Sequence, residues 1–347
     1  MLFVLISAIV IWFACFGFSV PYRGRWVLFG SFPAAIVFFL LIVPIPENKL
    51  NYAVREMAEP WAMFFGLGVL IWGYRWGLGR LRSKAEVKVA ETQVDSPLFS
   101  DTELNRYARH IVMREMGGPG QKALKEASVL VVGAGGLGSP VLQYLAAAGV
   151  GTIGIIDDDV VDNANLQRQV IHRDSDIGLP KVFSAQAAMI AQNPYVTVRP
   201  YERRLTDEIA EELISEYDLV LDGCDNFETR YLVNRICVAL GKPLISGALT
   251  QWEGQLSVFD PANDAPCYQC IFPQAPAPEL APSCAEAGVI GPLPGVVGSM
   301  MAVEAIKVIT DAGASLRGEM IIYDALYGES RKITLESRAD CPICGTQ

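Results

Sequence analysis

The chain has 347 residues, of which 51% are hydrophobic and 19% charged, and its formal net charge at pH 7 is −10. This composition excludes collagen-like and disordered chains, and 8 cysteines in so long a chain do not indicate a disulfide scaffold. Residues 100–347 hold 32 of the 38 acidic residues but only 19 of the 28 basic ones, which argues against a general nucleic-acid-binding protein.

Long apolar runs occupy the N-terminal part of the chain. Residues 2–20 and 26–46 carry no charge, and each run is long enough to cross a bilayer core of about 30 Å as a helix. The third run, 61–79, is weaker because its charge-free part ends before Arg75. The sequence therefore predicts a membrane region over residues 1–82, with transmembrane helices at 2–20, 26–46 and 61–79.

The basic residues that flank these runs predict their orientation. Arg23 and Arg25 follow the first run and five basic residues lie between positions 75 and 88, whereas the link 47–60 holds three glutamates beside two basic residues. Because positively charged loops stay in the cytoplasm, we expect a multi-pass protein of the inner or plasma membrane with a cytoplasmic C-terminal body. A cleaved signal peptide, or a two-helix hairpin with an interfacial third segment, is the alternative.

A polar linker, 83–99, precedes a domain that we expect to span residues 100–347. Ser100 and Glu103 have the spacing of a capping box, which predicts the start of a helix. From there on, the apolar patterns are those of a globular protein.

A strand, a glycine turn, a helix and a second strand are predicted between residues 127 and 157. The strands are expected at 127–133 and 151–157, and the turn between them contains Gly133, Gly135, Gly136 and Gly138. Such glycines let the backbone approach a phosphate at the positive end of the following helix. Asp157 closes the second strand, where a carboxylate can accept hydrogen bonds from ribose hydroxyls.

Helices and strands continue to alternate after the glycine turn. Helices are expected at 181–192, 206–216 and 226–240, and strands at 196–201, 218–222 and 243–246. This alternation predicts an α/β fold: a Rossmann-like, doubly wound, mostly parallel sheet with helices on both faces. Residues 252–259 and 318–336 alternate in polarity and predict antiparallel strands near the C-terminus.

Charged side chains follow the ends of several predicted strands. Arg168, Lys181 and Asp225 lie near the carboxyl ends of these strands, where ligands bind in sheets of this kind. Fixed cations can hold the oxygens of a triphosphate, and a carboxylate can hold Mg²⁺. These residues favour ATP chemistry over the NAD-dependent oxidoreductase that the glycine turn alone would suggest.

Two CxxC pairs, Cys267/Cys270 and Cys341/Cys344, indicate a metal site. Four thiolates at about 2.3 Å from Zn²⁺ make a closed tetrahedral site without an open position for catalysis. Disulfides are the alternative, and a cytoplasmic location disfavours them. The sequence therefore predicts structural Zn²⁺ that ties the end of the chain to its middle.

Eight short motifs follow one another between residues 106 and 344. They are RYARHIVM (106–113), GAGGLGSP (133–140), IIDDDVVDNANLQRQ (155–169), PK (180–181), LDGCDN (221–226), CYQC (267–270), CAEAGVIGPL (284–293) and CPIC (341–344). In this order they resemble the MoeB/ThiF/HesA family of ubiquitin-activating-type enzymes, and most closely its MoeB branch. The resemblance covers about residues 100–347, so the N-terminal membrane region is a departure from the usual soluble members.

The resemblance implies a reaction and its partners. The C-terminal glycine carboxylate of a ubiquitin-like sulfur-carrier protein ending in Gly-Gly would be adenylated by ATP with release of pyrophosphate. This would be a step of sulfur transfer for molybdopterin, thiamin or a similar product. A homodimer and a separate persulfide donor are also expected.

The resemblance also implies roles for single residues. Asp157 would hold the ribose; Asn165, Arg168 and Lys181 would contact the phosphates; Asp225 would bind Mg²⁺, with Asn226 beside it. Arg109 would reach into the ATP site of the partner subunit, although by itself it reads as a charge on an exposed helix. Cys284 matches the family's acyl- or persulfide-accepting cysteine, and its loop could equally hold an ordinary thiol.

Other functions remain open at this point. A ThiF-like enzyme could activate a carboxylate on a tRNA base or a peptide instead of a carrier protein. An NAD-dependent oxidoreductase would use the same glycine turn for a different cofactor. A non-catalytic membrane scaffold with a degenerate fold is the third alternative, against which the presence of Arg168, Lys181 and Asp225 argues.

Overall fold

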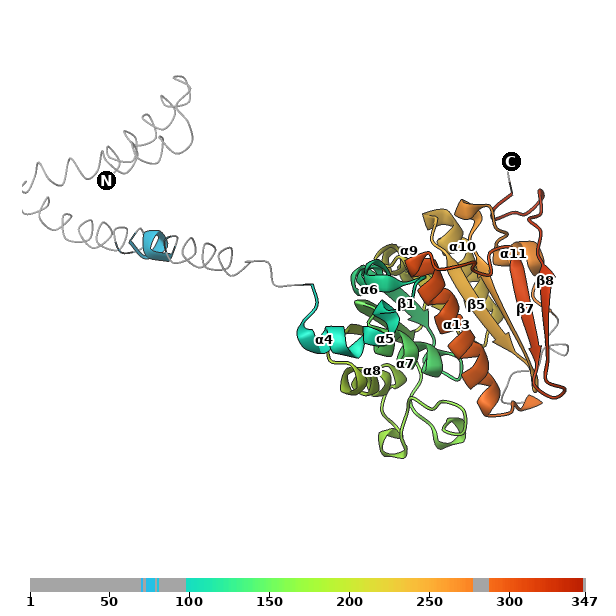
Figure 1. The fold of residues 1–347 in the computed structure, drawn as a ribbon, viewed down its shortest axis with the longest axis horizontal. Helices are drawn as coiled ribbons and strands as arrows, with labels where there is room; N and C mark the ends of the chain where they lie inside the picture. The colour runs from blue at the N-terminus through green and yellow to red at the C-terminus, as the bar shows by residue number, and fades with distance from the viewer. Residues whose placement is uncertain (1–69, 71–72, 79, 81–97, 277–286, 346–347) are drawn as a thin grey trace, which may run out of the picture. The chain divides into compact units, whose positions relative to one another are not determined.

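A computed structural model of the chain describes residues 70, 73–78, 80, 98–276 and 287–345 (Figure 1). The chain divides into two units, Met1–Ser96 and Pro97–Gln347. In the first unit the described residues, between 70 and 80, are helical. The helices expected at 2–20 and 26–46 lie outside the described residues, as does most of the expected linker.

A mixed sheet of eight strands forms the centre of the second unit, in the order β3-β2-β1-β4-β5-β6-β7-β8. The strands are β1 (Ser128–Val132), β2 (Thr152–Asp157), β3 (Thr197–Glu202), β4 (Leu219–Asp222), β5 (Leu244–Leu249), β6 (Glu253–Phe259), β7 (Glu319–Asp324) and β8 (Glu329–Thr334). The first five strands of the chain pair in parallel, and β6, β7 and β8 pair antiparallel. The predicted α/β sheet with antiparallel C-terminal strands is confirmed.

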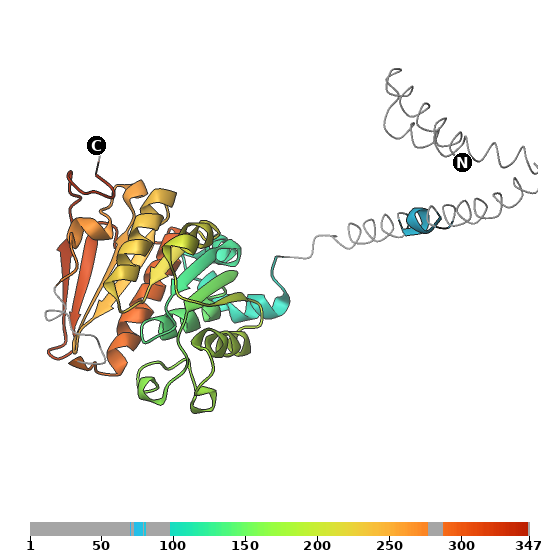
Figure 2. The same ribbon diagram turned by 180° about the vertical axis from the view of Figure 1, so that it is seen from behind.

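Helices cover both faces of this sheet. They are α4 (Asp101–Arg106), α5 (Ala108–Ile111), α6 (Gly117–Glu126), α7 (Gly138–Ala148), α8 (Lys181–Gln192), α9 (Asp207–Ser215), α10 (Phe227–Leu240), α11 (Tyr268–Ile271) and α13 (Pro292–Thr310). Helix α13 lies in front of the sheet in Figure 1, and α10 lies in front of it in Figure 2, which shows the unit from behind. The fold is therefore doubly wound.

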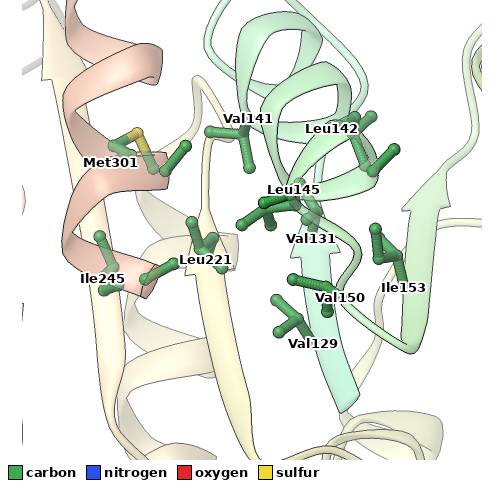
Figure 3. Close-up of a cluster of buried hydrophobic side chains, with 14 of the residues drawn as sticks. Val129, Val131, Val141, Leu142, Leu145, Val150, Ile153, Leu221, Ile245 and Met301 are labelled. Atoms are coloured by element: carbon green, nitrogen blue, oxygen red, sulfur yellow. The ribbon is translucent and has the colours of Figure 1, made fainter. Parts of the chain in front are cut away.

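Alternate residues of the parallel strands enter two separate hydrophobic cores. Val129 and Val131 of β1 pack with α7, α8 and α13 on one face, as Figure 3 shows for the cluster around Leu145. Leu130 and Val132 of the same strand pack with α9 and α10 on the other face. Because both faces are covered, the central strands β1 and β4 are apolar at most positions, as is typical of parallel sheets.

The domain begins at a capped helix, as the sequence predicts. The Ser100 hydroxyl accepts a hydrogen bond from the Glu103 N–H (3.3 Å), and the Ser100 N–H donates to the Glu103 carboxylate (3.0 Å). The same carboxylate pairs with Lys125 of α6. Arg106 donates to the carbonyl oxygen of Gln192 (2.6 Å), so α4 is held against both α6 and the end of α8.

Helix α13 is the one helix among the described residues that is long and apolar enough to cross a membrane. Its apolar composition has a different explanation here, because Val297, Met301 and Ala305 are fully buried against the sheet and α7. Met301 points into the core beside Ile245 (Figure 3).

Candidate active site

A cavity of about 1430 Å³ lies at the carboxyl ends of the parallel strands. The strand order reverses between β1 and β4, and ligands bind outside the strand ends at such a switch point. Most of the residues expected to act line this cavity: Gly133, Gly135, Gly136, Asp157, Arg168, Lys181, Asp225 and Asn226. Residues from three separate connections, β1 to α7, β2 to α8 and β4 to α10, are thus brought together at one site.

The glycine turn between β1 and α7 is shaped by contacts that a side chain would prevent. A Cβ atom at Gly138 would lie 2.0 Å from the carbonyl oxygen of Gly133, so α7 can begin this close only with glycine. Gly133 itself has a φ of +95°. The N–H groups of Gly135 and Gly136, which line the cavity, donate to no acceptor among the described residues. Two free N–H groups at a helix N-terminus form a site for a phosphate.

Asp157 ends β2 and supports the glycine turn. Its Oδ2 atom accepts a hydrogen bond from the Ala134 N–H (2.7 Å), and its Oδ1 atom accepts one from the Asp159 N–H (2.9 Å). Burial raises the pKa of this carboxyl above its usual value, against the lowering effect of Lys181 and these N–H groups. A carboxylate has about four acceptor positions, so two remain for ribose hydroxyls.

Lys181 is the first residue of α8, and its ammonium group is held by a residue that the sequence analysis did not single out. Its Nζ atom lies 2.6 Å from Oδ2 of Asp159, which also lines the cavity. The same two residues are also joined through their backbones, because the Lys181 N–H donates to the carbonyl oxygen of Asp159 (2.9 Å). The only sequence signal for Asp159 was its place in an acidic run directly after β2.

Arg168 projects from the turn that follows the short 3₁₀ helix η1 (Asn163–Asn165). Its Nη2 atom donates to Oδ1 of Asn165 (2.8 Å), and its Nη1 atom donates to the carbonyl oxygen of Ala164 (3.2 Å). Asn165 lies outside the cavity lining and orients the Arg168 guanidinium group, and its expected contact with phosphate stays a prediction.

Asp225 lies in the loop between β4 and α10, and its side chain is exposed to the cavity. Asn226 caps α10, because its Oδ1 atom accepts a hydrogen bond from the Thr229 N–H (2.9 Å). The cap fixes the point where the helix begins. Asp225 therefore sits at a defined position on the cavity wall, although no side chain holds its carboxylate among the described residues.

A buried arginine on α10, Arg230, holds the loop that carries Asp225. Arg230 donates to the carboxylate of Asp222 (3.2 Å), the hydroxyl of Ser246 (3.0 Å) and the carbonyl oxygens of Cys224 (2.5 Å) and Gly247 (2.9 Å). Burial and the Asp222 carboxylate raise the pKa of the Cys224 thiol well above its usual value, so this cysteine stays protonated and unreactive. The sequence signal for Arg230 is its position one helical turn after Asn226.

Two expected catalytic residues are not part of this cavity in the described structure. Arg109 is exposed on α5 and does not line the cavity of its own chain. Cys284 falls in residues 277–286, which lie outside the described residues. Gly138 lies beneath the glycine turn rather than in the lining.

The four cysteines of the CxxC pairs gather between α11 and the C-terminal turn. Their sulfur atoms all lie within 4.8 Å of one another, with 3.8 Å between Cys267 and Cys270 and 3.6 Å between Cys267 and Cys341. A tetrahedral site with Zn–S bonds of about 2.3 Å separates its sulfurs by about 3.8 Å. All four are free thiols, far beyond the S–S distance of about 2.05 Å in a disulfide. The donor set therefore fits Zn²⁺.

Comparison with known proteins agrees with this site. The ThiF family model matches residues 107–343. The chain is 51% identical over 253 residues to a sulfur carrier protein adenylyltransferase of Thermus thermophilus, covering 72% of this chain and 93% of the relative. It is 48% identical over 244 residues to a SAMP-activating enzyme E1 of Haloferax volcanii, covering 70% of this chain and 90% of the relative.

Longer relatives and solved structures extend the comparison. The chain is 46% identical to the adenylyltransferase and sulfurtransferase MOCS3 of Mus musculus over 72% of this chain, but it spans only 54% of that protein. The crystal structure of E. coli MccB with AMPCPP and MccA shares the fold, with a TM-score of 0.63 and 23% identity over 71% of this chain and 76% of that one. From the glycine turn, the cavity and these matches together, the chain belongs to the ThiF family.

Proposed function

We propose that this protein adenylates the C-terminal glycine carboxylate of a ubiquitin-like sulfur-carrier protein with ATP and releases pyrophosphate. One observation carries the proposal: the two free N–H groups of the glycine turn, the cations Arg168 and Lys181 and the carboxylate Asp225 all surround one cavity. The identity of 51% to a sulfur carrier protein adenylyltransferase supports the choice of substrate.

The chemistry assigns one task to each group. An oxygen of the carrier's terminal carboxylate attacks the α-phosphorus, and the bond from that phosphorus to the bridging oxygen of pyrophosphate breaks. Arg168 and Lys181 hold the charge that collects on the phosphate oxygens, while Asp157 holds the ribose. Fixed charges placed around the reacting phosphate stabilise such a transition state strongly.

Asp225 suits Mg²⁺, because the ion prefers oxygen ligands and keeps several waters when it joins one or two carboxylates to phosphates. The Asp225 carboxylate is exposed in the cavity and is not engaged by a described cation. When bound, Mg²⁺ would supply positive charge to the phosphates. Asp225 would hold it in place.

The cavity is larger than a nucleotide needs. Sites for small ligands commonly enclose about 300–1,000 Å³, whereas this cavity has about 1430 Å³ and reaches Ile322, Asp324, Glu329 and Arg331 on β7 and β8. We propose that the extended tail of the carrier enters from these antiparallel strands and brings its terminal carboxylate to the α-phosphate.

ATP–pyrophosphate exchange tests the proposal directly. The full chain in detergent is incubated with ATP, Mg²⁺, labelled pyrophosphate and a small carrier ending in Gly-Gly, with the same carrier shortened by its last two glycines as the control. We expect exchange only with the intact carrier, and its loss in Asp225→Ala. Exchange with a short peptide, or without any carrier, would contradict the carrier protein as the substrate. A complete lack of ATP-dependent exchange would contradict the adenylation activity itself.

We propose that a separate persulfide donor supplies sulfur to the activated carrier. Because adenylation precedes sulfur transfer, Cys284→Ala is expected to leave exchange intact while transfer to the carrier falls. Equal loss of both would place Cys284 in the adenylation step.

We further propose that Cys267, Cys270, Cys341 and Cys344 bind structural Zn²⁺. The support is the short distances between the four sulfur atoms and the burial of three of the four cysteines, with Cys344 half-buried. The site has no free position for a substrate, so zinc would hold the fold and take no part in adenylation.

The N-terminal region is proposed to anchor the protein in the inner or plasma membrane with the domain from Ser100 in the cytoplasm. The charge-free runs 2–20 and 26–46 and the basic residues that flank them support this topology. Extraction of membranes at high pH tests the anchor. The full chain should stay with the membrane, and release into the supernatant would contradict it.

A homodimer is proposed as the working assembly, with Arg109 of one subunit reaching the ATP site of the other. Two points support this proposal. Arg109 is exposed and does not line the cavity of its own chain. The family resemblance implies that this arginine enters the ATP site of the partner subunit. Mixing Arg109→Ala chains with Asp225→Ala chains tests this. Exchange regained in the mixture supports donation across subunits, and a mixture as inactive as its parts opposes it.

A further inference from the structure

His172 is one of only two histidines in the chain, and it lies directly beneath the glycine turn. Its side chain is 6% exposed. The Nε2 atom lies 2.9 Å from the carbonyl oxygen of Ala134, and the Nδ1 atom lies 2.9 Å from the hydroxyl oxygen of Ser184 on α8. The imidazole ring thus joins the turn to the helix that begins with Lys181.

The partners of the ring fix its tautomer. A carbonyl oxygen can only accept, so Nε2 must carry the hydrogen and donate it to Ala134. The Ser184 hydroxyl has a single hydrogen, which it donates either to Nδ1 of the neutral ring or to Oδ2 of Asp176, and Nε2 donates to Ala134 in both cases. Burial lowers the pKa of His172, which favours this neutral form even though Asp157 and Asp176 oppose the shift.

The contact with Ala134 determines where the next N–H points. The carbonyl of Ala134 and the N–H of Gly135 belong to one planar trans peptide, in which the two groups point in opposite directions. Because His172 holds the carbonyl on the buried side, the Gly135 N–H is turned towards the cavity that Gly135 lines. Asp157 holds the preceding peptide through the Ala134 N–H, so the turn is fixed from both sides.

Ser184 extends this support to a second loop. Its hydroxyl oxygen also lies 2.7 Å from Oδ2 of Asp176 in the short helix η2 (Asp174–Asp176). The Ser184 hydroxyl therefore lies between the ring and η2, and the ring cannot rotate away from Ala134 without breaking the buried hydrogen bond from Nε2.

We propose that His172 is a positioning residue that aims the Gly135 N–H at a phosphate of the nucleotide. The inference rests on the proposed function in one respect, that the cavity binds ATP. It does not depend on the carrier, the dimer or the membrane anchor.

Equilibrium binding of ATP and of adenosine to the full-length chain tests the proposal. His172→Phe keeps a ring of similar size but removes both hydrogen bonds, so ATP should bind about tenfold more weakly while adenosine binds as before. His172→Gln restores a donor near the Nε2 position and should recover most of the ATP affinity. His110→Phe is the matched control, because among the described residues the His110 ring bonds only to Gln121, and it lies outside the cavity lining.

The outcomes separate positioning from a general structural role. Equal weakening of ATP and adenosine, or a His172→Gln variant no better than His172→Phe, would overturn the proposal. If His172→Phe does not fold, Ser184→Ala decides, since it should weaken ATP about threefold and spare adenosine. A wild-type chain that binds no ATP would refute the proposed function, whereas ATP binding unchanged in the folded variants would refute only the role of His172.

Discussion

Lys181 and Asp159 form an ion pair of very unequal exposure: the lysine side chain is 5% exposed and the aspartate side chain 67%, with 2.6 Å between Nζ and Oδ2. The ammonium group cannot withdraw, because its stem is buried at the start of α8. The carboxylate, in contrast, can turn into solvent at little cost when a phosphate arrives. The pair therefore holds the Lys181 ammonium group on the cavity wall, where it can bind a phosphate.

This asymmetry predicts unequal effects of mutation. Lys181→Met fits the buried channel of the lysine stem but removes the charge, so exchange should fall by about 10²–10³-fold. Asp159→Asn, the control, should change it by about threefold or less, because the carboxylate is exposed and only holds the cation in the absence of nucleotide. Similar losses in the two variants would mean that Asp159 has a direct part in the reaction.

Arg230 and Arg235 offer a matched pair of arginines on one helix. Arg230→Met leaves the buried Asp222 carboxylate without its cation and should lower the free energy of unfolding by about 3–5 kcal/mol. Arg235→Met removes only an exposed ion pair with Asp207 and should cost less than about 1 kcal/mol. Urea unfolding of the full chain in detergent measures both, and equal losses would contradict a supporting role for Arg230.

The cysteine cluster predicts a metal content and a matched pair of variants. The purified protein should contain one Zn²⁺ per chain, and Cys341→Ala should lose it and unfold at a lower temperature, because metal binding adds directly to folding free energy. Cys237→Ala also removes a buried thiol, one that lies outside the cluster, and it should keep its zinc. Metal analysis measures the zinc content of the two variants, and thermal unfolding measures their stability. Zinc retained in Cys341→Ala would contradict the site.

His172 also predicts a dependence of stability on pH. Its pKa in the folded chain lies below the usual 6.5, so the unfolded chain takes up this proton first as the pH falls. The contribution of His172 to stability is therefore complete above about pH 6.5 and is lost as the pH falls towards the folded pKa. The stability difference between the wild type and His172→Phe should shrink over this range. A difference independent of pH would show that the ring is not buried in its neutral form.

The order of the sheet could be predicted because each parallel strand is a short apolar run between helical patterns. Strands β1 to β6 and helices α8 to α10 lie within a few residues of their expected bounds, and the stretch expected at 318–336 divides into β7 and β8. Helix α6 was not predicted, because it begins with Gly117-Gly118-Pro119-Gly120, a typical turn sequence. The helix forms because tertiary packing stabilises it: Leu124 is fully buried in the hydrophobic core that α6 shares with α13.

The residues that we propose to contact the nucleotide were recognisable from the sequence, and those that hold them in place were not. Arg168, Lys181 and Asp225 follow strand ends, so the fold itself brings them to one edge of the sheet. His172 and Ala134 are 38 residues apart, and nothing in either segment indicates that a ring nitrogen meets a carbonyl oxygen. Such supporting contacts depend on the exact orientation of side chains, which spacing along the chain does not specify.

The two CxxC pairs enclose the segment that carries α13, β7 and β8, and with it Ile322, Asp324, Glu329 and Arg331 at the far end of the cavity. A metal that joins the pairs would close this segment into a loop and so reduce the conformational entropy of the unfolded chain. Loss of zinc should therefore destabilise first the part of the fold that forms the far wall of the cavity.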